Sequence, residues 1–113
     1  MIDGPESWPA WLEDGEGKRT PIRGSCSLGR SESNQITLRD DTVSRRHAVI
    51  QPQGEHEYWL VDFGSSNGTY VTLGHDPEIR LLREELILHG TGIISFGQSA
   101  SAPEAEIVEF HCS

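Results

Sequence analysis

The sequence predicts an all-β domain, an antiparallel sandwich of two twisted sheets with about 10 or 11 strands. Short runs rich in β-branched and aromatic residues recur between turn residues, and helical periodicity is almost absent. The chain of 113 residues contains 12 glycines and 6 prolines, which suits a fold with many turns. Its length fits one domain over residues 1–113, and an end directly after an expected strand suggests a module of a longer protein.

Each expected strand is a short β-rich run bounded by turn residues. In chain order they are Trp8–Leu12, Arg19–Leu28, Gln35–Leu38, His47–Gln53, Glu57–Asp62, Thr69–Thr72, Ile79–Leu82, Ile93–Phe96 and Ile107–His111. In 47–51 and 58–62, alternate positions can face a core while their neighbours face solvent, which is typical of stacked antiparallel sheets. The leucines of Glu78–Leu88 partly fit a helical stripe, but we interpret this segment as one strand, a short turn and the approach to another. Loop is expected at Ser99–Glu106.

The charge distribution argues against nucleic acid as a partner. The formal net charge is −9, whereas phosphate backbones require a broad basic face. Residues 18–46 nevertheless form a basic island with seven basic and three acidic residues, while residues 47–113 carry two basic and ten acidic residues. Because charges are screened within about 8 Å at physiological salt, a bound phosphate would be governed by the local arginines.

Composition also predicts an intracellular, non-secreted protein without a membrane partner. No segment approaches the roughly 20 apolar residues that a membrane helix needs, and the first 25 residues are acidic and rich in tryptophan. Two cysteines cannot form a disulfide framework, so a reducing compartment is expected. The scattered histidines lack metal-ligand spacing, and we expect no metal and no cofactor.

Three spaced motifs carry the candidate chemistry, and each borders an expected strand. They are Gly29-Arg30, Ser44-Arg45-Arg46-His47 and Ser66-Asn67-Gly68-Thr69. Brought together at one end of a sandwich, these loops would form a phosphate-binding surface, because a guanidinium fork and a small hydroxyl donate to phosphate oxygens. His47 is expected to hold its loop through neighbouring backbone, and Asp62 to cap free amides of the loop that follows it.

The order of these motifs resembles the forkhead-associated (FHA) domain family. The resemblance runs from about Leu28 to Gly97, through LGRSESNQITLRDDTVSRRHAVI, YWLVDFGSSNGTYV and LILHGTGIISFG. It implies a β-sandwich signalling module that binds phosphothreonine peptides and recruits a phosphorylated partner. Two positions depart from the family pattern: Thr72 stands where asparagine is common, and Gly92 replaces the usual aspartate before Ile93.

The resemblance also implies a role for each motif residue. The residues expected to contact the phosphopeptide are Arg30, Ser44, Arg45, Arg46, Ser66 and Asn67. The residues expected to support the binding loops are Gly29, His47, Asp62, Gly68 and Thr69. Serine would touch the phosphate with a basic residue beside it, and the asparagine would clamp the extended peptide next to the phosphothreonine.

Other interpretations of the same residues stay open at this point. The sandwich could be an assembly module that binds an unmodified partner, since fold does not dictate function. Ser44, His47 and Asp62 could act as a hydrolytic triad, although no Gly-x-Ser-x-Gly elbow surrounds the serine and we expect no enzymatic activity. Asn67-Gly68 could simply close a hairpin, with positive φ at both residues.

Overall fold

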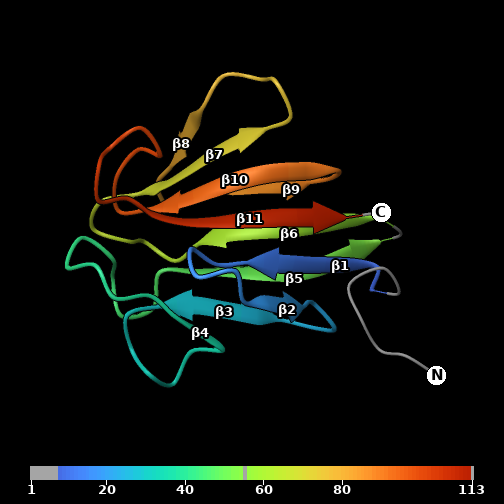
Figure 1. The fold of residues 1–113 in the computed structure, drawn as a ribbon, viewed down its shortest axis with the longest axis horizontal. Coiled ribbons are helices and arrows are strands. Elements are labelled where there is room, and N and C mark those ends of the chain that lie inside the picture. The colour runs from blue at the N-terminus through green and yellow to red at the C-terminus, as the bar shows by residue number, and fades with distance from the viewer. Residues whose placement is uncertain (1–7, 55, 113) are drawn as a thin grey trace.

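The structure, a computed structural model, describes residues 8–54 and 56–112 and consists of two β-sheets packed face to face (Figure 1). The first sheet has the order β2-β1-β11-β10-β7-β8. Its strands are β1 (Ala10–Glu13), β2 (Arg19–Pro21), β7 (Thr69–Leu73), β8 (Ile79–Leu81), β10 (Thr91–Phe96) and β11 (Glu106–Cys112). The second sheet has the order β4-β3-β5-β6-β9. Its strands are β3 (Cys26–Gly29), β4 (Ile36–Thr37), β5 (Ala48–Gly54), β6 (Glu57–Asp62) and β9 (Glu85–Leu88).

These two sheets confirm the predicted all-β sandwich. All strand pairs are antiparallel except β3 with β4, where Leu28 lies opposite Ile36 in a short parallel ladder. Within the described ranges there is no helix, and hence none that is long and apolar enough to cross a membrane.

The core lies between the sheets and follows from the period-two pattern of the strands. In β6, Tyr58, Leu60 and Asp62 are buried, whereas Trp59 and Val61 are half-buried, so the alternation predicted from sequence is confirmed. The largest fully buried apolar side chains are Phe96, Phe110, Leu12, Leu28, Ile50, Leu60, Leu88 and Ile94. The alternation also turns the Asp62 carboxylate inward, where it needs hydrogen-bond donors.

The prediction of one strand over Arg19–Leu28 was wrong. This segment forms β2 and β3, which belong to different sheets, so the chain crosses the sandwich between them. Pro21, the last residue of β2, has no N–H for a ladder, and a bend at Arg23 and Gly24 precedes β3. By contrast, the interpretation of Glu78–Leu88 as a strand, a turn and a further strand is confirmed by β8 and β9.

The hairpin interpretation of Asn67-Gly68 was also wrong. The strands on either side of this turn, β6 and β7, lie in different sheets and do not pair with each other. Of the two residues, Gly68 alone has a positive φ, at 93°. The 63–68 loop therefore crosses from one sheet to the other and exposes Asn67 at the end of the sandwich.

Candidate functional site

Three loops that carry the predicted motifs lie at the same end of the sandwich, on the left of Figure 1. They are the β3–β4 loop (residues 30–35), the β4–β5 loop (residues 38–47) and the β6–β7 loop (residues 63–68). We call them together the loop cluster. The β4–β5 loop is the central member, because hydrogen bonds join it to each of the other two.

Arg30 is bound to the β4–β5 loop by its backbone and its side chain. Its N–H donates to the carbonyl of Ser44 at 3.0 Å, and its Nε donates to the carbonyl of Val43 at 3.0 Å. The residue is exposed, and its terminal amino groups form no hydrogen bond or ion pair with another described side chain. Because Nε is held by backbone, the guanidinium is oriented while its outer two nitrogens stay available to an anion.

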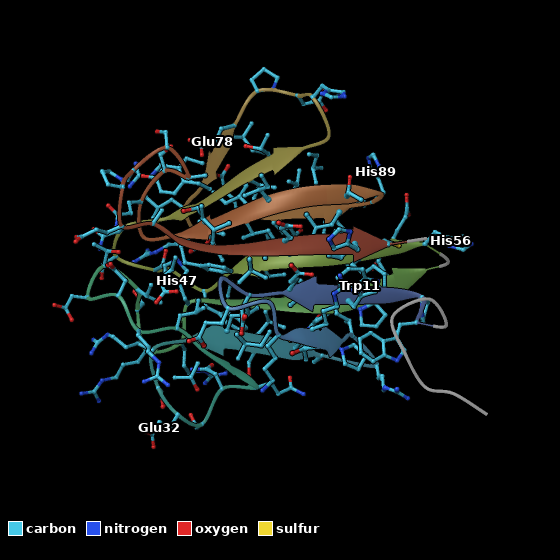
Figure 2. All side chains as sticks on the ribbon, viewed as in Figure 1. Trp11, Glu32, His47, His56, Glu78 and His89 are labelled. Carbon is cyan, nitrogen blue, oxygen red and sulfur yellow. The ribbon has the colours of Figure 1, made fainter. Side chains whose placement is uncertain are left out.

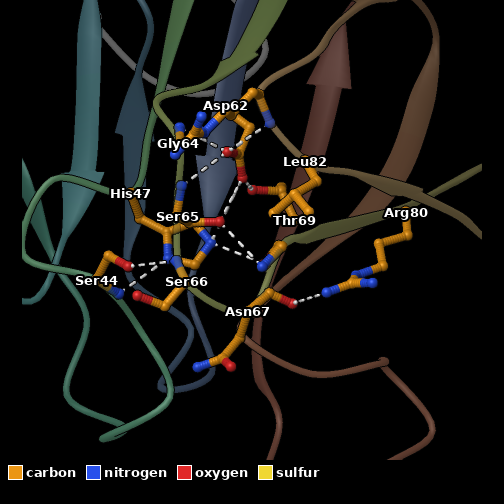
Figure 3. Close-up of polar contacts among 12 residues, drawn as sticks. Ser44, His47, Asp62, Gly64, Ser65, Ser66, Asn67, Thr69, Arg80 and Leu82 are labelled. Carbon is orange, nitrogen blue, oxygen red and sulfur yellow. Dashed lines mark hydrogen bonds and ion pairs between the residues drawn. The ribbon is translucent and has the colours of Figure 1, made fainter.

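Ser44 connects the β4–β5 and β6–β7 loops. Its Oγ accepts a hydrogen bond from the backbone N–H of Ser66 at 3.0 Å, and its own N–H donates to His47 Nδ1 at 3.0 Å (Figure 3). Since the hydroxyl oxygen acts as acceptor in this contact, its hydrogen remains free to donate outward.

Asn67 is held from two sides. Its side-chain Nδ2 donates to the backbone carbonyl of Thr42 at 2.8 Å. Its backbone carbonyl accepts from Arg80 Nη2 at 3.3 Å. The Arg80 guanidinium also lies over the Tyr70 ring, 5.8 Å from its centroid. The exposed Asn67 amide thus has a defined position, and its Oδ1 is left as an acceptor.

The other predicted contact residues are exposed but lie differently. The Arg45 side chain forms no hydrogen bond or ion pair with a described residue, whereas the Arg46 guanidinium lies over the Phe63 ring, 5.5 Å from its centroid. Ser66 contributes its backbone N–H to the contact with Ser44, and its side chain is exposed. The structure therefore places the three loops in contact, with Arg46 turned toward the Phe63 side of the cluster.

Gly29 permits the close approach of the β3–β4 and β4–β5 loops. A β-carbon at this position would overlap the carbonyl oxygen of Arg45 and lie 2.8 Å from Asn34 Nδ2. That Nδ2 group donates to the carbonyls of Ser31 at 2.8 Å and Arg45 at 2.7 Å. The two loops can approach this closely because residue 29 lacks a side chain.

His47 is fully buried beneath the loop cluster, where Figure 2 shows it inside the sandwich at the loop end. Its Nδ1 accepts from the Ser44 N–H, so Nε2 carries the ring hydrogen and donates to the carbonyl of Gly68 at 2.8 Å. Burial lowers the pKa of His47, and this effect outweighs the Gly68 contact and the field of Asp62, which act in the opposite direction. The imidazole is therefore neutral, and it forms hydrogen bonds with the backbone of two loops.

Asp62 organises the β6–β7 loop from its buried side (Figure 3). Its Oδ1 accepts from the N–H groups of Gly64, Ser65 and Arg83, at 2.9, 2.9 and 3.1 Å. Its Oδ2 accepts from the hydroxyls of Ser65 and Thr69 at 2.6 and 2.7 Å. Burial raises the pKa of the carboxyl, but these hydrogen bonds outweigh burial and hold the pKa below its ordinary value. Asp62 thus accepts hydrogen bonds from free amides of the loop that follows it.

The Ser44, His47 and Asp62 side chains are not arranged as a hydrolytic triad. Both imidazole nitrogens are engaged by backbone, at Ser44 N–H and Gly68 C=O, so neither is available to the serine hydroxyl. The Ser44 hydroxyl accepts from Ser66, and His47 Nε2 lies 3.9 Å from Asp62 Oδ2, beyond hydrogen-bond reach. The geometry required by that alternative is therefore missing.

Sequence reasoning missed three residues that hold the loops. The Ser65 hydroxyl donates to Asp62 and accepts from the Gly68 N–H at 2.9 Å. The Asp-x-x-Ser spacing of residues 62 and 65 could have indicated this contact from the sequence. Asn34 joins two loops, and an asparagine after Ser-Glu-Ser was a weaker turn signal. Glu106 accepts from the N–H groups of Arg39 and Asp40 at 2.6 and 3.0 Å, and nothing local in the sequence indicated this contact.

Comparison with known proteins decides the family. The model of the FHA domain matches residues 26–97, well over half of the chain. The chain belongs to the FHA domain family. Within this domain, the match covers β3 to β10 and all three loops of the loop cluster.

Among its relatives, the FHA domain is similar to the glycogen accumulation regulator GarA of Mycolicibacterium smegmatis. The two are 47% identical over 62 residues, which cover 48% of this chain and 39% of that protein. The chain spans less than half the length of the curated relatives that it matches first.

Solved structures share the fold over nearly the whole FHA domain. Mycobacterium tuberculosis EmbR, determined in complex with a low-affinity phosphopeptide, matches 92% of this chain and 24% of its own, with 30% identity and a TM-score of 0.69. An FHA domain studied for phosphothreonine-dependent interactions matches 92% of this chain and 96% of its own, with 29% identity and a TM-score of 0.68.

Proposed function

We propose that this FHA domain is a signalling module that binds a phosphothreonine-containing segment of a partner protein at the loop cluster. The observation that carries the proposal is the junction of three loops at Ser44. Its carbonyl accepts from Arg30, its hydroxyl accepts from Ser66, and the adjoining Thr42 carbonyl accepts from Asn67. One oriented guanidinium, one free hydroxyl hydrogen and one fixed amide are thus carried by three loops that hydrogen bonds join at Thr42 and Ser44.

The chemistry of a phosphothreonine suits these groups. It carries nearly two negative charges and three acceptor oxygens. Arg30 would donate its outer two nitrogens and Ser44 its hydroxyl, with Arg45 adding positive charge from the same loop. Asn67 and Ser66 would bind beside the phosphate, the former to the peptide backbone. Two known structures of this fold concern phosphopeptide or phosphothreonine-dependent binding, which supports the proposal.

The proposal involves binding alone, with no bond made or broken. FHA domains are binding modules, and here His47 and Asp62 are committed to loop structure. It also places the domain inside the cell, where cytosolic kinases supply phosphothreonine and where the thiols of Cys26 and Cys112 stay reduced.

Isothermal titration with a matched pair of peptides tests the proposal. The pair shares one sequence, drawn from a degenerate phosphothreonine library by its binding to the domain, and differs in the phosphate alone. We expect binding of the phosphorylated peptide and none of the other. A glutamate in place of the phosphothreonine should bind poorly, because a carboxylate is planar and carries one charge.

The alternative is a phosphorylation-independent assembly module on the same sandwich. Phosphatase treatment of a bound partner separates the two functions. Binding that survives the treatment, or equal titration of both peptides, contradicts the phosphothreonine proposal and favours the assembly module.

A further inference from the structure

One short turn orients two side chains of the candidate site. The Thr42 backbone carbonyl accepts from Asn67 Nδ2 at 2.8 Å, and the adjoining Val43 carbonyl accepts from Arg30 Nε at 3.0 Å. The arginine comes from the β3–β4 loop and the asparagine from the β6–β7 loop. Because exposed side chains otherwise occupy several rotamers, these two carbonyls decide how the guanidinium and the amide point. We call residues 40–43 the supporting turn.

Asp40 closes the supporting turn. Its carbonyl accepts from the Val43 N–H at 3.0 Å, which is the hydrogen bond of a β-turn. Its Oδ1 accepts from the Thr42 N–H at 2.8 Å and from the Thr42 hydroxyl at 2.6 Å. Hydrogen bonds from the Thr42 side chain and backbone hold the pKa of Asp40 below its ordinary value of 3.8. The turn is therefore bonded within itself, and its position depends on what holds it to the sandwich.

Glu106 attaches the supporting turn to the opposite sheet. It is the first residue of β11 in the first sheet, whereas the turn follows β4 of the second sheet. Its Oε1 accepts from the Arg39 N–H at 2.6 Å and from the Asp40 N–H at 3.0 Å. One carboxylate oxygen thus binds two successive N–H groups where the turn begins. Such charge-assisted hydrogen bonds are stronger than those between neutral groups.

Gly97 lets the other half of the turn approach the same sheet. This glycine follows β10 directly and has a φ of 86°. A β-carbon on Gly97 would overlap the Thr42 hydroxyl and would lie 2.6 Å from the Thr42 carbonyl oxygen. That carbonyl is the one that accepts from Asn67. The turn is thus bonded to β11 at one end and packed against the end of β10 at the other.

Glu106 acts on the site only through the supporting turn. Within the described ranges, its side chain forms hydrogen bonds with the Arg39 and Asp40 N–H groups alone. It also lies outside residues 26–97, so the match to the family does not cover it. Any influence of Glu106 on a bound phosphopeptide therefore passes through the turn to Arg30 and Asn67.

We propose that Glu106 is a positioning residue for phosphopeptide binding, because it holds the turn whose carbonyls orient Arg30 and Asn67. This inference rests on the proposed function and adds to the site a residue that contacts no ligand. A turn released from Glu106 would sample more positions. The phosphopeptide would then have to order Arg30 and Asn67 as it binds, and this cost in conformational entropy lowers affinity.

Three substitutions test the role of Glu106. Glu106→Ala removes the acceptor of both hydrogen bonds, and Glu106→Gln keeps an oxygen acceptor without the charge. Glu104→Ala is the matched control, because Glu104 is exposed in the β10–β11 connection, two residues away. Isothermal titration measures the affinity of each variant for a phosphothreonine peptide that binds the wild-type domain. Thermal unfolding identifies a temperature at which every variant is folded.

The expected affinities follow from the hydrogen bonds that each variant keeps. Glu106→Ala should bind about five- to twentyfold more weakly than wild type, since it loses two hydrogen bonds to a charged group and transmits part of that loss to the site. Glu106→Gln should lie between Glu106→Ala and wild type. Glu104→Ala should bind as wild type does.

Two further measurements distinguish positioning from a general loss of stability. In NMR spectra of the unliganded domain, the Arg30 Nε–H and Asn67 Nδ2 signals should shift in Glu106→Ala and stay in place in Glu104→Ala. A double-mutant cycle adds Asn67→Ala. The loss of affinity caused by Glu106→Ala should be smaller in the Asn67→Ala background than in wild type, because part of its effect passes through Asn67.

The outcomes separate this inference from the proposed function. The inference is overturned if Glu106→Ala binds as tightly as wild type, or if Glu106→Gln binds no better than Glu106→Ala. It is equally overturned if the two NMR signals stay in place, or if the loss is undiminished in the Asn67→Ala background. In each of these cases the wild-type domain still requires the phosphate. Equal binding of the peptide with and without its phosphate by the wild-type domain overturns the proposed function itself.

Discussion

His47 Nε2 donates to the carbonyl of Gly68 at 2.8 Å, and this contact ties the start of β5 to the turn that presents Asn67. On the other side of the ring, Nδ1 accepts from the Ser44 N–H at 3.0 Å. The neutral ring with hydrogen on Nε2 satisfies both contacts, whereas a protonated ring would turn the Ser44 contact into two opposed donors. The protonation state of one buried histidine is thus coupled to two binding loops.

This coupling predicts that stability falls on acidification. The pKa of His47 in the folded protein lies below its ordinary value of 6.5. The unfolded chain therefore binds the proton more readily, and the stability that neutral His47 contributes is fully present above about pH 6.5 and is lost as pH falls below it. Chemical denaturation between pH 5 and 8 should show this decrease, and phosphopeptide affinity should fall with it.

Variants at two histidines isolate the effect. His47→Gln should be less stable at neutral pH and should lose most of the dependence on pH between 5 and 7. His75→Gln serves as the matched control, because His75 is exposed in the β7–β8 connection. If stability depends on pH in His47→Gln as it does in wild type, His47 is not the group that causes the loss of stability on acidification.

Arg30→Ala should remove phosphopeptide binding and leave the fold intact. Two charge-assisted hydrogen bonds to phosphate are lost, at about 1.5–3 kcal/mol each, which corresponds to roughly a hundredfold or more in affinity. Arg30→Lys should recover part of the binding, because it keeps the charge but loses the fork and the Nε contact with the Val43 carbonyl. Titration of the matched peptides measures both, and full affinity in Arg30→Ala would exclude Arg30 from the site.

Ser44→Ala should weaken binding more than it weakens the fold. The substitution removes a donor to phosphate and leaves the Ser66 N–H without its acceptor, at a cost of about 1 kcal/mol in stability. We expect at least a tenfold loss of affinity by titration. Ser25→Ala, in the exposed turn between β2 and β3, is the control and should behave as wild type.

Asp62→Asn should destabilise the domain by about 2–4 kcal/mol, since a buried group that accepts from five donors loses part of its acceptor capacity. The pKa of Asp62 lies below the ordinary value of 3.8, so its stabilisation is present above that pH and is lost as pH falls further. Denaturant unfolding measures the loss. Amide exchange at Gly64, Ser65 and Arg83 should also accelerate.

The control for this variant is Asp76→Asn, at an exposed position between β7 and β8. Its unfolding free energy should match that of wild type. Equal stability of Asp62→Asn and Asp76→Asn would show that the carboxylate network contributes nothing.

Gly29→Ala should separate the β3–β4 and β4–β5 loops. The added methyl group would overlap the Arg45 carbonyl, which is backbone and cannot rotate away. We expect a loss of about 1–3 kcal/mol in stability together with weaker phosphopeptide binding. Gly24→Ala is the matched control, because a β-carbon there meets no atom within 4 Å. Equal melting temperatures of Gly29→Ala and Gly24→Ala would contradict the close approach of residue 29 to the Arg45 carbonyl.

Local patterns predicted much of the fold. The alternation in β6 and the turn residues between runs indicated a two-sheet sandwich, and the inward position of Asp62 follows from that alternation. The alternation expected at the start of β5 was wrong, because Ala48, Val49 and Ile50 are all buried. The order of the motifs around Arg30, Ser44 and Asn67 indicated the family. The error at Arg19–Leu28 arose because a strand pattern does not show in which sheet its two halves pair.

The sequence by itself determined the class of the domain and the residue types that its three loop motifs carry, because strand periodicity and loop motifs are properties of neighbouring residues. Only the tertiary structure decided which loops meet and how each side chain is oriented. Glu106 binds the Arg39 N–H across 67 residues of chain, and Asp62 binds the Arg83 N–H across 21. Such contacts exist because packing the two sheets brings distant segments together, and no local pattern encodes that distance.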